Sequence, residues 1–174
     1  MKGCIHLYTG TGKGKTTCSV GVSVRAAGSG LPVWFVQFLK SAPSGEVDVL
    51  RKIPNITMLR HEGSGKFSWQ MDDSEKREMA RSHHEFLREA FSQANHHEMA
   101  VLVLDEILDA CEIGMVEWEY LLDLLQTRGD GVEVILTGRH APTWLEEMAD
   151  YHTEMTKKRH PFDQGIAGRK GIEW

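Results

Sequence analysis

The sequence predicts an α/β domain whose mostly parallel sheet carries helices on both faces. Short apolar runs alternate with longer amphipathic stretches along all 174 residues, and this is the pattern of repeated strand–helix units. Two of the runs, VWFVQF at 33–38 and AVLVL at 100–104, are apolar almost throughout, as strands covered on both faces are. A chain of this length suits one such domain with a real core, and we expect it to comprise residues 1–174.

The expected elements follow one another without an internal repeat, a low-complexity segment or a linker. Strands are expected at residues 4–9, 33–38, 56–60, 100–104 and 133–136. Helices are expected at residues 15–27, 46–53, 74–95, 116–128 and 141–149. Asp72 and Glu75 are spaced as a capping box at the start of the third helix. The segment 61–72 is glycine-rich and irregular, and the tail 156–174 has no clear period.

The composition of the chain argues against two classes of binding partner, nucleic acids and membranes. The net charge is −5, which argues against nucleic acid as the main partner, because neutralising its phosphates requires a basic surface. No apolar run has the length of a bilayer span, and the N-terminus lacks the pattern of a secretory leader. We therefore expect no membrane partner and a cytoplasmic location. A small anionic ligand in a locally positive pocket is compatible with this charge.

The segment TGTGKGKT at residues 9–16 lies between the first strand and the first helix, where a phosphate-binding P-loop occurs. Its glycines let backbone N–H groups turn toward an anion, and the start of the helix adds the positive end of its dipole. Lys15 supplies a full charge, and the Thr16 hydroxyl is placed to bind Mg²⁺. The usual consensus has a glycine where this chain has Thr9, so the phosphates need not lie as they do in an ordinary ATPase.

Two acidic residues, Asp105 and Glu106, follow the apolar strand at 100–104. A carboxylate at the carboxyl end of a buried parallel strand points into the crevice where ligands bind. Asp105 takes the Walker B position, which holds Mg²⁺ directly or through water, and a glutamate in the place of Glu106 activates water in hydrolysing ATPases. The alternative is a pair of solvated loop acids.

Several other residues admit two interpretations. Arg25 on the first helix either reaches a phosphate or pairs on the helix surface, and Arg139 at a strand end either faces an anion or is solvated. Phe67 and Trp69, in the irregular segment, either cover a flat hydrophobic ligand or fold over the core. Four histidines in adjacent pairs lack the carboxylate spacing of a metal site, and we do not expect them to form one: His83, His84, His96 and His97.

Taken in order, these motifs resemble the P-loop cob(I)alamin adenosyltransferases, the CobA/BtuR type of corrinoid adenosyltransferase. The resemblance runs along nearly the whole chain, and it depends on the order and spacing of segments that are each weak alone. They are YTGTGKGKTT at 8–17, RAAGSG at 25–30, VQF at 36–38, GKFSW at 65–69, VLDEI at 103–107, LTGR at 136–139, ADYHTEM at 149–155, HPF at 160–162 and GIEW at 171–174.

The resemblance implies a single-domain, RecA-like P-loop NTPase fold, a homodimer and a reductase, such as a flavoprotein, that supplies an electron. It implies transfer of the 5′-deoxyadenosyl group of ATP to Co(I) of a corrinoid, cob(I)yrinic acid a,c-diamide or cobalamin, with release of triphosphate, in adenosylcobalamin biosynthesis or salvage. Carried onto this chain, the catalytic residues would be Lys15, Thr16 and Glu106, the Mg²⁺ ligands Thr16, Asp105 and Glu106, and the corrinoid-binding residues Phe67 and Trp69. The ATP-binding residues would be Gly10, Thr11, Gly12, Lys13, Gly14, Lys15, Thr16, Thr17 and Arg25.

The chemistry of this reaction agrees with the motifs. Co(I) is a strong nucleophile that needs no protein base, so the enzyme has to align C5′ with cobalt and stabilise the departing triphosphate. In the family, a residue other than glycine at the place of Thr9 goes with a nucleotide bound in reverse, which exposes C5′. The alternatives are a RecA-like ATPase or small-molecule kinase that uses Glu106, and a non-catalytic ATP sensor; a nucleic-acid motor fits least.

Overall fold

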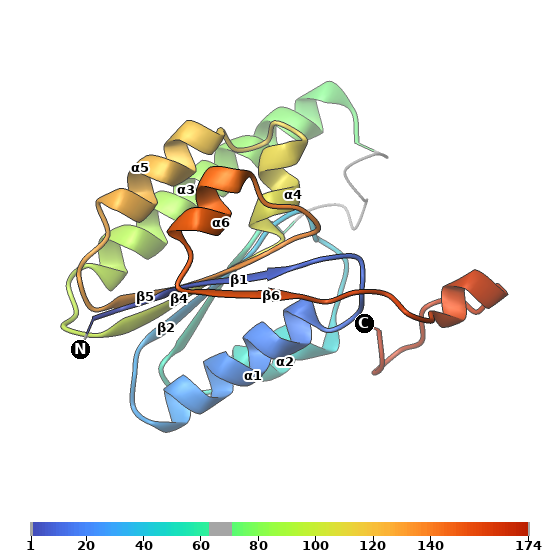
Figure 1. Cartoon of the computed structure of the whole chain (residues 1–174), viewed down its shortest axis with the longest axis horizontal. Coiled ribbons are helices and arrows are strands. Elements are labelled where there is room, and N and C mark those ends of the chain that lie inside the picture. The colour runs from blue at the N-terminus through green and yellow to red at the C-terminus, as the bar shows by residue number, and fades with distance from the viewer. Residues whose placement is uncertain (1, 63–70, 174) are drawn as a thin grey trace.

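The computed structural model describes residues 2–62 and 71–173 and confirms the predicted α/β fold (Figure 1). Within these residues one six-stranded sheet has the order β3-β2-β4-β5-β1-β6, and every pair of neighbouring strands is parallel. The strands are β1 (Ile5–Thr9), β2 (Val33–Gln37), β3 (Ile56–Arg60), β4 (Ala100–Asp105), β5 (Val132–Thr137) and β6 (Tyr151–Glu154).

Helices cover both faces of this sheet (Figure 1). On one face lie α1 (Lys15–Gly28) and α2 (Gly45–Leu50), and on the other lie α3 (Asp73–Ala94), α4 (Ile107–Glu112), α5 (Trp118–Gln126) and α6 (Thr143–Met148). Strand β4 supplies both of the cores between these layers. Leu102 and Leu104 belong to one apolar cluster, whereas Val101 and Val103 belong to the other, because successive side chains of a strand point to opposite faces.

The ten predicted elements are all present, with ends that differ by a few residues. The capping box of α3 is confirmed, since the Asp72 carboxylate accepts from the N–H groups of Ser74 and Glu75, while the Glu75 carboxylate accepts from the N–H of Asp72. None of the described helices is both long and apolar enough to cross a lipid bilayer.

Within the described residues, three elements were not predicted: α4, β6 and a 3₁₀ helix at Pro161–Gln164. Helix α4 has 6 residues, and only Glu106 separates it from β4, so no turn residues mark its start in the sequence. All four residues of β6 are exposed, so this strand has no apolar face for a pattern to reveal. Its existence depends on backbone pairing with β1, from His6 with Tyr151 to Thr9 with Glu154.

The order of the strands brings the P-loop and the acidic strand end together. Strand β5 lies between β1 and β4, and its last residue, Thr137, is paired with Tyr8 of β1. On the other side of β4, Gln37 of β2 is paired with Asp105. The carboxyl ends of four parallel strands therefore meet at one edge, which is where sheets of this kind bind ligands.

Helix α3 supports this edge through a buried histidine. His83 is 0% exposed, and its ring meets that of Phe38 edge-on, with centroids 4.9 Å apart. Its Nε2 accepts from the backbone N–H of Leu39 at 3.5 Å, and this contact requires a neutral ring. Burial, reinforced by the nearby His61 and His84, lowers the pKa of His83 to about 3.

This pKa predicts that acid destabilises the fold. The unfolded chain takes up a proton on His83 near the ordinary pKa of 6.5, whereas the folded chain does so only near 3, so stability present above the higher value is lost as the pH falls toward the lower one. At about 1.4 kcal/mol per pH unit, the loss amounts to about 2 kcal/mol by about pH 5. Urea unfolding of the wild type and of His83→Gln at about pH 7.5 and pH 5 measures it. If the free energy of unfolding falls equally in the wild type and in His83→Gln between these two pH values, the neutral ring of His83 is not the cause of the acid destabilisation.

Candidate functional site

A cavity of about 920 Å³ lies at the carboxyl edge of the sheet, a size that suits a nucleotide-sized ligand. Four segments line it. They are residues 11–17 with Val20 from the P-loop and α1, residues 40–46 after β2, Glu106 after β4, and His160 with residues 171–173 from the tail. Segments that are far apart in the sequence thus line the same cavity.

The glycines of the P-loop allow a close approach to the chain after β6. A Cβ atom on Gly10 would lie 2.5 Å from the carbonyl oxygen of Met155, and one on Gly12 would lie 2.6 Å from it. The Gly10 N–H donates to the carbonyl of Arg139 at 2.9 Å, and the Gly12 N–H donates to that of Met155 at 2.5 Å. These two amides shape the loop, so an anion would meet the start of α1 instead, where the first N–H groups lack helical acceptors.

Two lysines of the loop are held by backbone carbonyls. The Lys15 ammonium donates to the carbonyl oxygens of Gly10 at 2.7 Å and Gly12 at 3.0 Å. Burial lowers the pKa of Lys15, although the carboxylate of Asp109 opposes this. The Lys13 ammonium donates to the carbonyl of Ile172 at 3.0 Å, which ties the tail to the loop. Both lysines line the cavity, so their ammonium groups can reach an anion bound in it.

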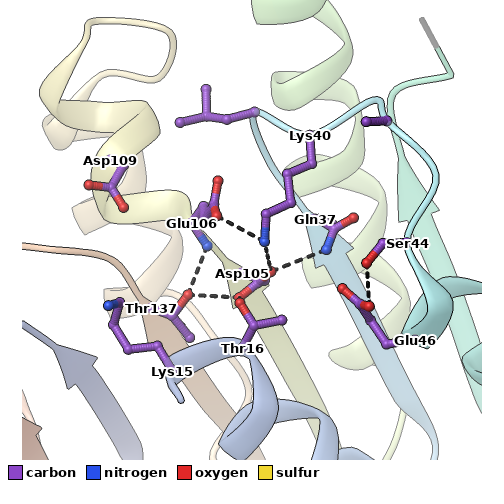
Figure 2. Close-up of polar contacts among 12 residues, drawn as sticks. Lys15, Thr16, Gln37, Lys40, Ser44, Glu46, Asp105, Glu106, Asp109 and Thr137 are labelled. Carbon is purple, nitrogen blue, oxygen red and sulfur yellow. Dashed lines mark hydrogen bonds and ion pairs between the residues drawn. The ribbon is translucent and has the colours of Figure 1, made fainter. Parts of the chain in front are cut away.

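Asp105 is fully buried at the end of β4. Its Oδ1 accepts from the hydroxyls of Thr16 at 2.8 Å and Thr137 at 2.9 Å, and its Oδ2 accepts from Nε2 of Gln37 at 3.3 Å (Figure 2). The Oε1 of Gln37 has no hydrogen-bond partner among the described residues. Since a buried carboxylate is tolerated only when its oxygens are satisfied, these donors hold Asp105 in one orientation.

Lys40, just after β2, lies against both acidic residues. Its Nζ is 2.9 Å from Oε1 of Glu106 and 3.6 Å from Oδ2 of Asp105 (Figure 2). Burial opposes the charge on Lys40, but the two carboxylates outweigh it and raise the pKa of this ammonium. Burial raises the pKa of Glu106, even though Lys40 opposes it.

The structure brings Lys15, Thr16 and Glu106 to the same cavity, with Asp105 hydrogen-bonded to Thr16 beneath it. Arg25 is exposed in the last turn of α1 and is not one of the described residues that line the cavity. Ten residues of helix separate it from Lys15 by about 15 Å, so its contact with ATP stays a prediction.

The predicted ATP-binding residues Thr11 to Gly14 and Thr17 also line the cavity, whereas Arg139 is not among the described residues that line it. Arg139 contributes its backbone, since its carbonyl accepts from Gly10 and its N–H donates to Asp109 at 3.3 Å. Phe67 and Trp69 lie outside the described residues.

Gln37, Thr137 and the tail residues of the cavity lie in segments that carry the family resemblance, but sequence analysis assigned none of them, nor Lys40, a role in the site. A signal existed for Lys40, because a charged residue soon after a buried strand belongs to the ligand-binding edge. Using that signal required knowing that β2 is the neighbour of β4. The GIEW segment at 171–174 carries part of the family resemblance, but its contact with Lys13 joins residues 159 positions apart and could not be read from the sequence.

The donor atoms at this edge fit Mg²⁺. The Thr16 hydroxyl and the carboxylates of Asp105 and Glu106 are hard oxygen donors, which Mg²⁺ prefers. Among the described residues there is no group of three or more His, Cys, Asp or Glu side chains that could hold a metal ion. Mg²⁺ here would complete its ligands with water and phosphate oxygens, as is usual where it binds with a nucleotide.

Comparison with solved structures supports the fold alone. The cytoplasmic domain of EssC matches with a TM-score of 0.55 at 19% identity, over 97% of this chain and 34% of that one. At this identity the likeness carries no information about activity.

Comparison of sequences is more specific. A corrinoid adenosyltransferase of Pseudomonas aeruginosa is 34% identical over 174 residues, which cover 99% of this chain and 84% of the relative. One of Escherichia coli K12 is 32% identical over 178 residues, with coverage of 99% and 86%. One of Salmonella typhimurium is 30% identical over 179 residues, again with coverage of 99% and 86%. The family model described as ATP:corrinoid adenosyltransferase BtuR/CobO/CobP matches residues 1–174, and the chain belongs to this family.

Proposed function

We propose that the chain, as one domain, transfers the 5′-deoxyadenosyl group of ATP to Co(I) of a corrinoid and releases triphosphate. The observation that supports this most is the convergence of the P-loop residues 11–17 and of Glu106 on one cavity, with the Thr16 hydroxyl 2.8 Å from Asp105. A phosphate loop joined to a pair of acidic residues suits a nucleotide and its cation.

The reaction needs positioning and charge stabilisation more than acid–base chemistry. The electron pair of Co(I) forms the Co–C5′ bond while the C5′–O bond breaks, and the bonding electrons leave with triphosphate. No proton moves, so the protein has to align the reacting atoms and stabilise the negative leaving group. Lys15 would exchange the carbonyls of Gly10 and Gly12 for phosphate oxygens. Mg²⁺ would be held by Thr16 and Glu106 with Asp105, and it would supply further positive charge against the triphosphate.

Thr9 supports a nucleotide that runs in reverse along the loop. It takes the place of the first glycine of the consensus and is 4% exposed. Its Oγ1 lies 2.8 Å from Nε2 of His152, and its carbonyl accepts from the N–H of Met155 at 2.8 Å. These contacts join β1 to β6. On the family resemblance, in which a residue other than glycine at this place goes with a reversed nucleotide, we propose that C5′ rather than the γ-phosphate faces the second substrate.

The finer parts of the proposal rest on the family resemblance. They are a homodimer in the cytoplasm, an electron-donating reductase such as a flavoprotein, and cob(I)yrinic acid a,c-diamide or cobalamin as the corrinoid. The role in adenosylcobalamin biosynthesis or salvage belongs to the same group of proposals.

Loss of the Lys15 ammonium or of the Thr16 hydroxyl should abolish turnover while the fold remains. Removing a charged contact to the leaving group costs several kcal/mol in the transition state, so we expect Lys15→Ala and Thr16→Ala to be slower by about 100-fold or more. Thr16→Ser keeps the hydroxyl and should retain most activity, as should Lys52→Ala, which removes an exposed lysine away from the cavity. Rates with ATP, Mg²⁺ and chemically reduced cobalamin test this. Near-normal turnover in both alanine variants would contradict the phosphate-site assignment.

The inorganic product distinguishes this function from a RecA-like ATPase or kinase. Attack at C5′ yields triphosphate, whereas use of Glu106 to activate water or a hydroxyl yields phosphate or ADP. We expect phosphorus NMR of the reaction mixture to show triphosphate in step with corrinoid turnover. Stoichiometric ADP would instead support the kinase or ATPase.

The aromatic pair Phe67 and Trp69 should act in cobalt activation rather than in ATP binding. A donor ligand below the corrin ring stabilises Co(II), and bulky apolar side chains can take its place and exclude water. Phe67→Ala and Trp69→Ala should lose most activity when Co(II) is supplied with a biological reductant. They should keep much more with corrinoid already reduced to Co(I), and ATP affinity should change little. The proposal is falsified if both activities fall equally.

A further inference from the structure

The reaction described above gives no task to Lys40, although its ammonium lies against both acidic residues of the proposed metal site. Its Nζ is 2.9 Å from Oε1 of Glu106 and 3.6 Å from Oδ2 of Asp105 (Figure 2). The Lys40 side chain is 31% exposed and lines the cavity together with Thr16 and residues 11–15. A positive charge therefore lies where oxygen ligands of a divalent cation converge.

The backbone on both sides of this ion pair is unusual. Leu39, which precedes Lys40, has φ 59, and Glu106 has φ 65. Left-handed conformations are uncommon for residues other than glycine, and they persist where the surrounding structure enforces them. His83 accepts from the Leu39 N–H at 3.5 Å, and the Thr137 hydroxyl accepts from the Glu106 N–H at 2.8 Å. The fold thus holds both partners of the pair in place at some cost in strain.

The segment that carries Lys40 is also held from β3. Arg60 is buried, at 8% exposure, and its Nη2 donates to the carbonyl of Lys40 at 3.3 Å and to that of Ala42 at 2.8 Å. The backbone at Lys40 is therefore fixed, whereas its four-carbon side chain can swing about that point. A motion of the ammonium needs no change in the fold.

Electrostatics explains why the ammonium is there and why it has to leave. Two adjacent carboxylates in a partly buried site repel each other unless a cation lies between them. A divalent cation bound to the same oxygens would repel the Lys40 ammonium, so the two cannot occupy this place together. Once displaced, the ammonium remains in the cavity that the phosphates of a nucleotide would fill.

We propose that Lys40 exchanges partners: it neutralises Asp105 and Glu106 in the nucleotide-free chain, gives way to the divalent cation, and then pairs with the triphosphate. The first half concerns the protein and the cation alone. The second half rests on the proposed function, because it takes triphosphate as the leaving group. Lys40 thereby links binding of the cation to the presence of phosphate, since the ammonium leaves more readily when a new anionic partner is available.

Mn²⁺ serves as a paramagnetic probe for the cation, and its free concentration is read from its EPR signal. In nucleotide-free protein, Lys40→Met removes the competing charge, so we expect it to bind Mn²⁺ about tenfold more tightly than the wild type. Glu106→Gln combined with Lys40→Met should lose this gain. Lys52→Met removes an exposed lysine outside the cavity and should bind Mn²⁺ as the wild type does. Equal or weaker binding by Lys40→Met overturns the first half of the proposal.

Inorganic triphosphate with saturating Mn²⁺ tests the second half by calorimetry. Here Lys40→Met lacks a phosphate partner, and we expect it to bind triphosphate about tenfold more weakly. Lys40→Arg keeps the charge and should restore most of this affinity. The two effects have opposite signs, which a merely structural role of Lys40 would not produce. Unchanged or tighter triphosphate binding by Lys40→Met overturns the exchange.

Neither measurement uses a corrinoid. Both can therefore be interpreted even if the chain turns out not to catalyse adenosyl transfer. If Lys40→Met is too unstable to titrate, its thermal unfolding gives the same information. We then expect Mn²⁺ alone to raise the unfolding temperature of the variant by more than that of the wild type, because the cation replaces the missing ammonium. An equal rise in both proteins counts against the proposal.

Discussion

Satisfying one buried carboxylate is the constraint on which the arrangement of the site depends. Asp105 has no exposed surface, and leaving such a charge without partners would cost about 3–5 kcal/mol. Its hydrogen bonds come from Thr16, Gln37 and Thr137, and the Lys40 ammonium lies 3.6 Å from its Oδ2. These partners follow or end three other strands, so Asp105 joins the P-loop, β2 and β5 to the end of β4. The Asp105 carboxylate, which we propose as a ligand of the cation, therefore also holds the P-loop next to the acidic end of β4.

The parallel sheet makes this junction possible. Because β5 separates β1 from β4, the P-loop and the acidic residues are two strands apart, and Thr137 at the end of β5 spans the interval. Its hydroxyl donates to Asp105 and accepts from the N–H of Glu106. A phosphate and a cation that bind between the P-loop and the acidic residues would thus meet polar groups that the sheet has already oriented. This orientation reduces the reorganisation that the reaction requires.

The outer wall of the cavity is held differently. Residues 171–173 of the tail contact the P-loop through Lys13, whose ammonium is 3.1 Å from the exposed Glu173 carboxylate. Glu173 also pairs with Arg169 at 3.0 Å. Exposed ion pairs of this kind contribute little and weaken with salt. This side of the cavity therefore depends on weaker contacts than the buried hydrogen bonds of Asp105.

The sequence by itself determined the elements whose signals are local. Continuous apolar runs marked the buried strands, the glycine-rich TGTGKGKT segment marked the P-loop, and the place of Asp105 and Glu106 after an apolar run marked the ligand-binding end of a strand. Only the tertiary structure decided the place of Lys40, the pairing of the exposed strand β6 and the contact of the tail with Lys13. The physical reason is that each of these depends on which strands are neighbours. Strand order is set by the packing of the whole sheet, and a run of neighbouring residues does not encode it.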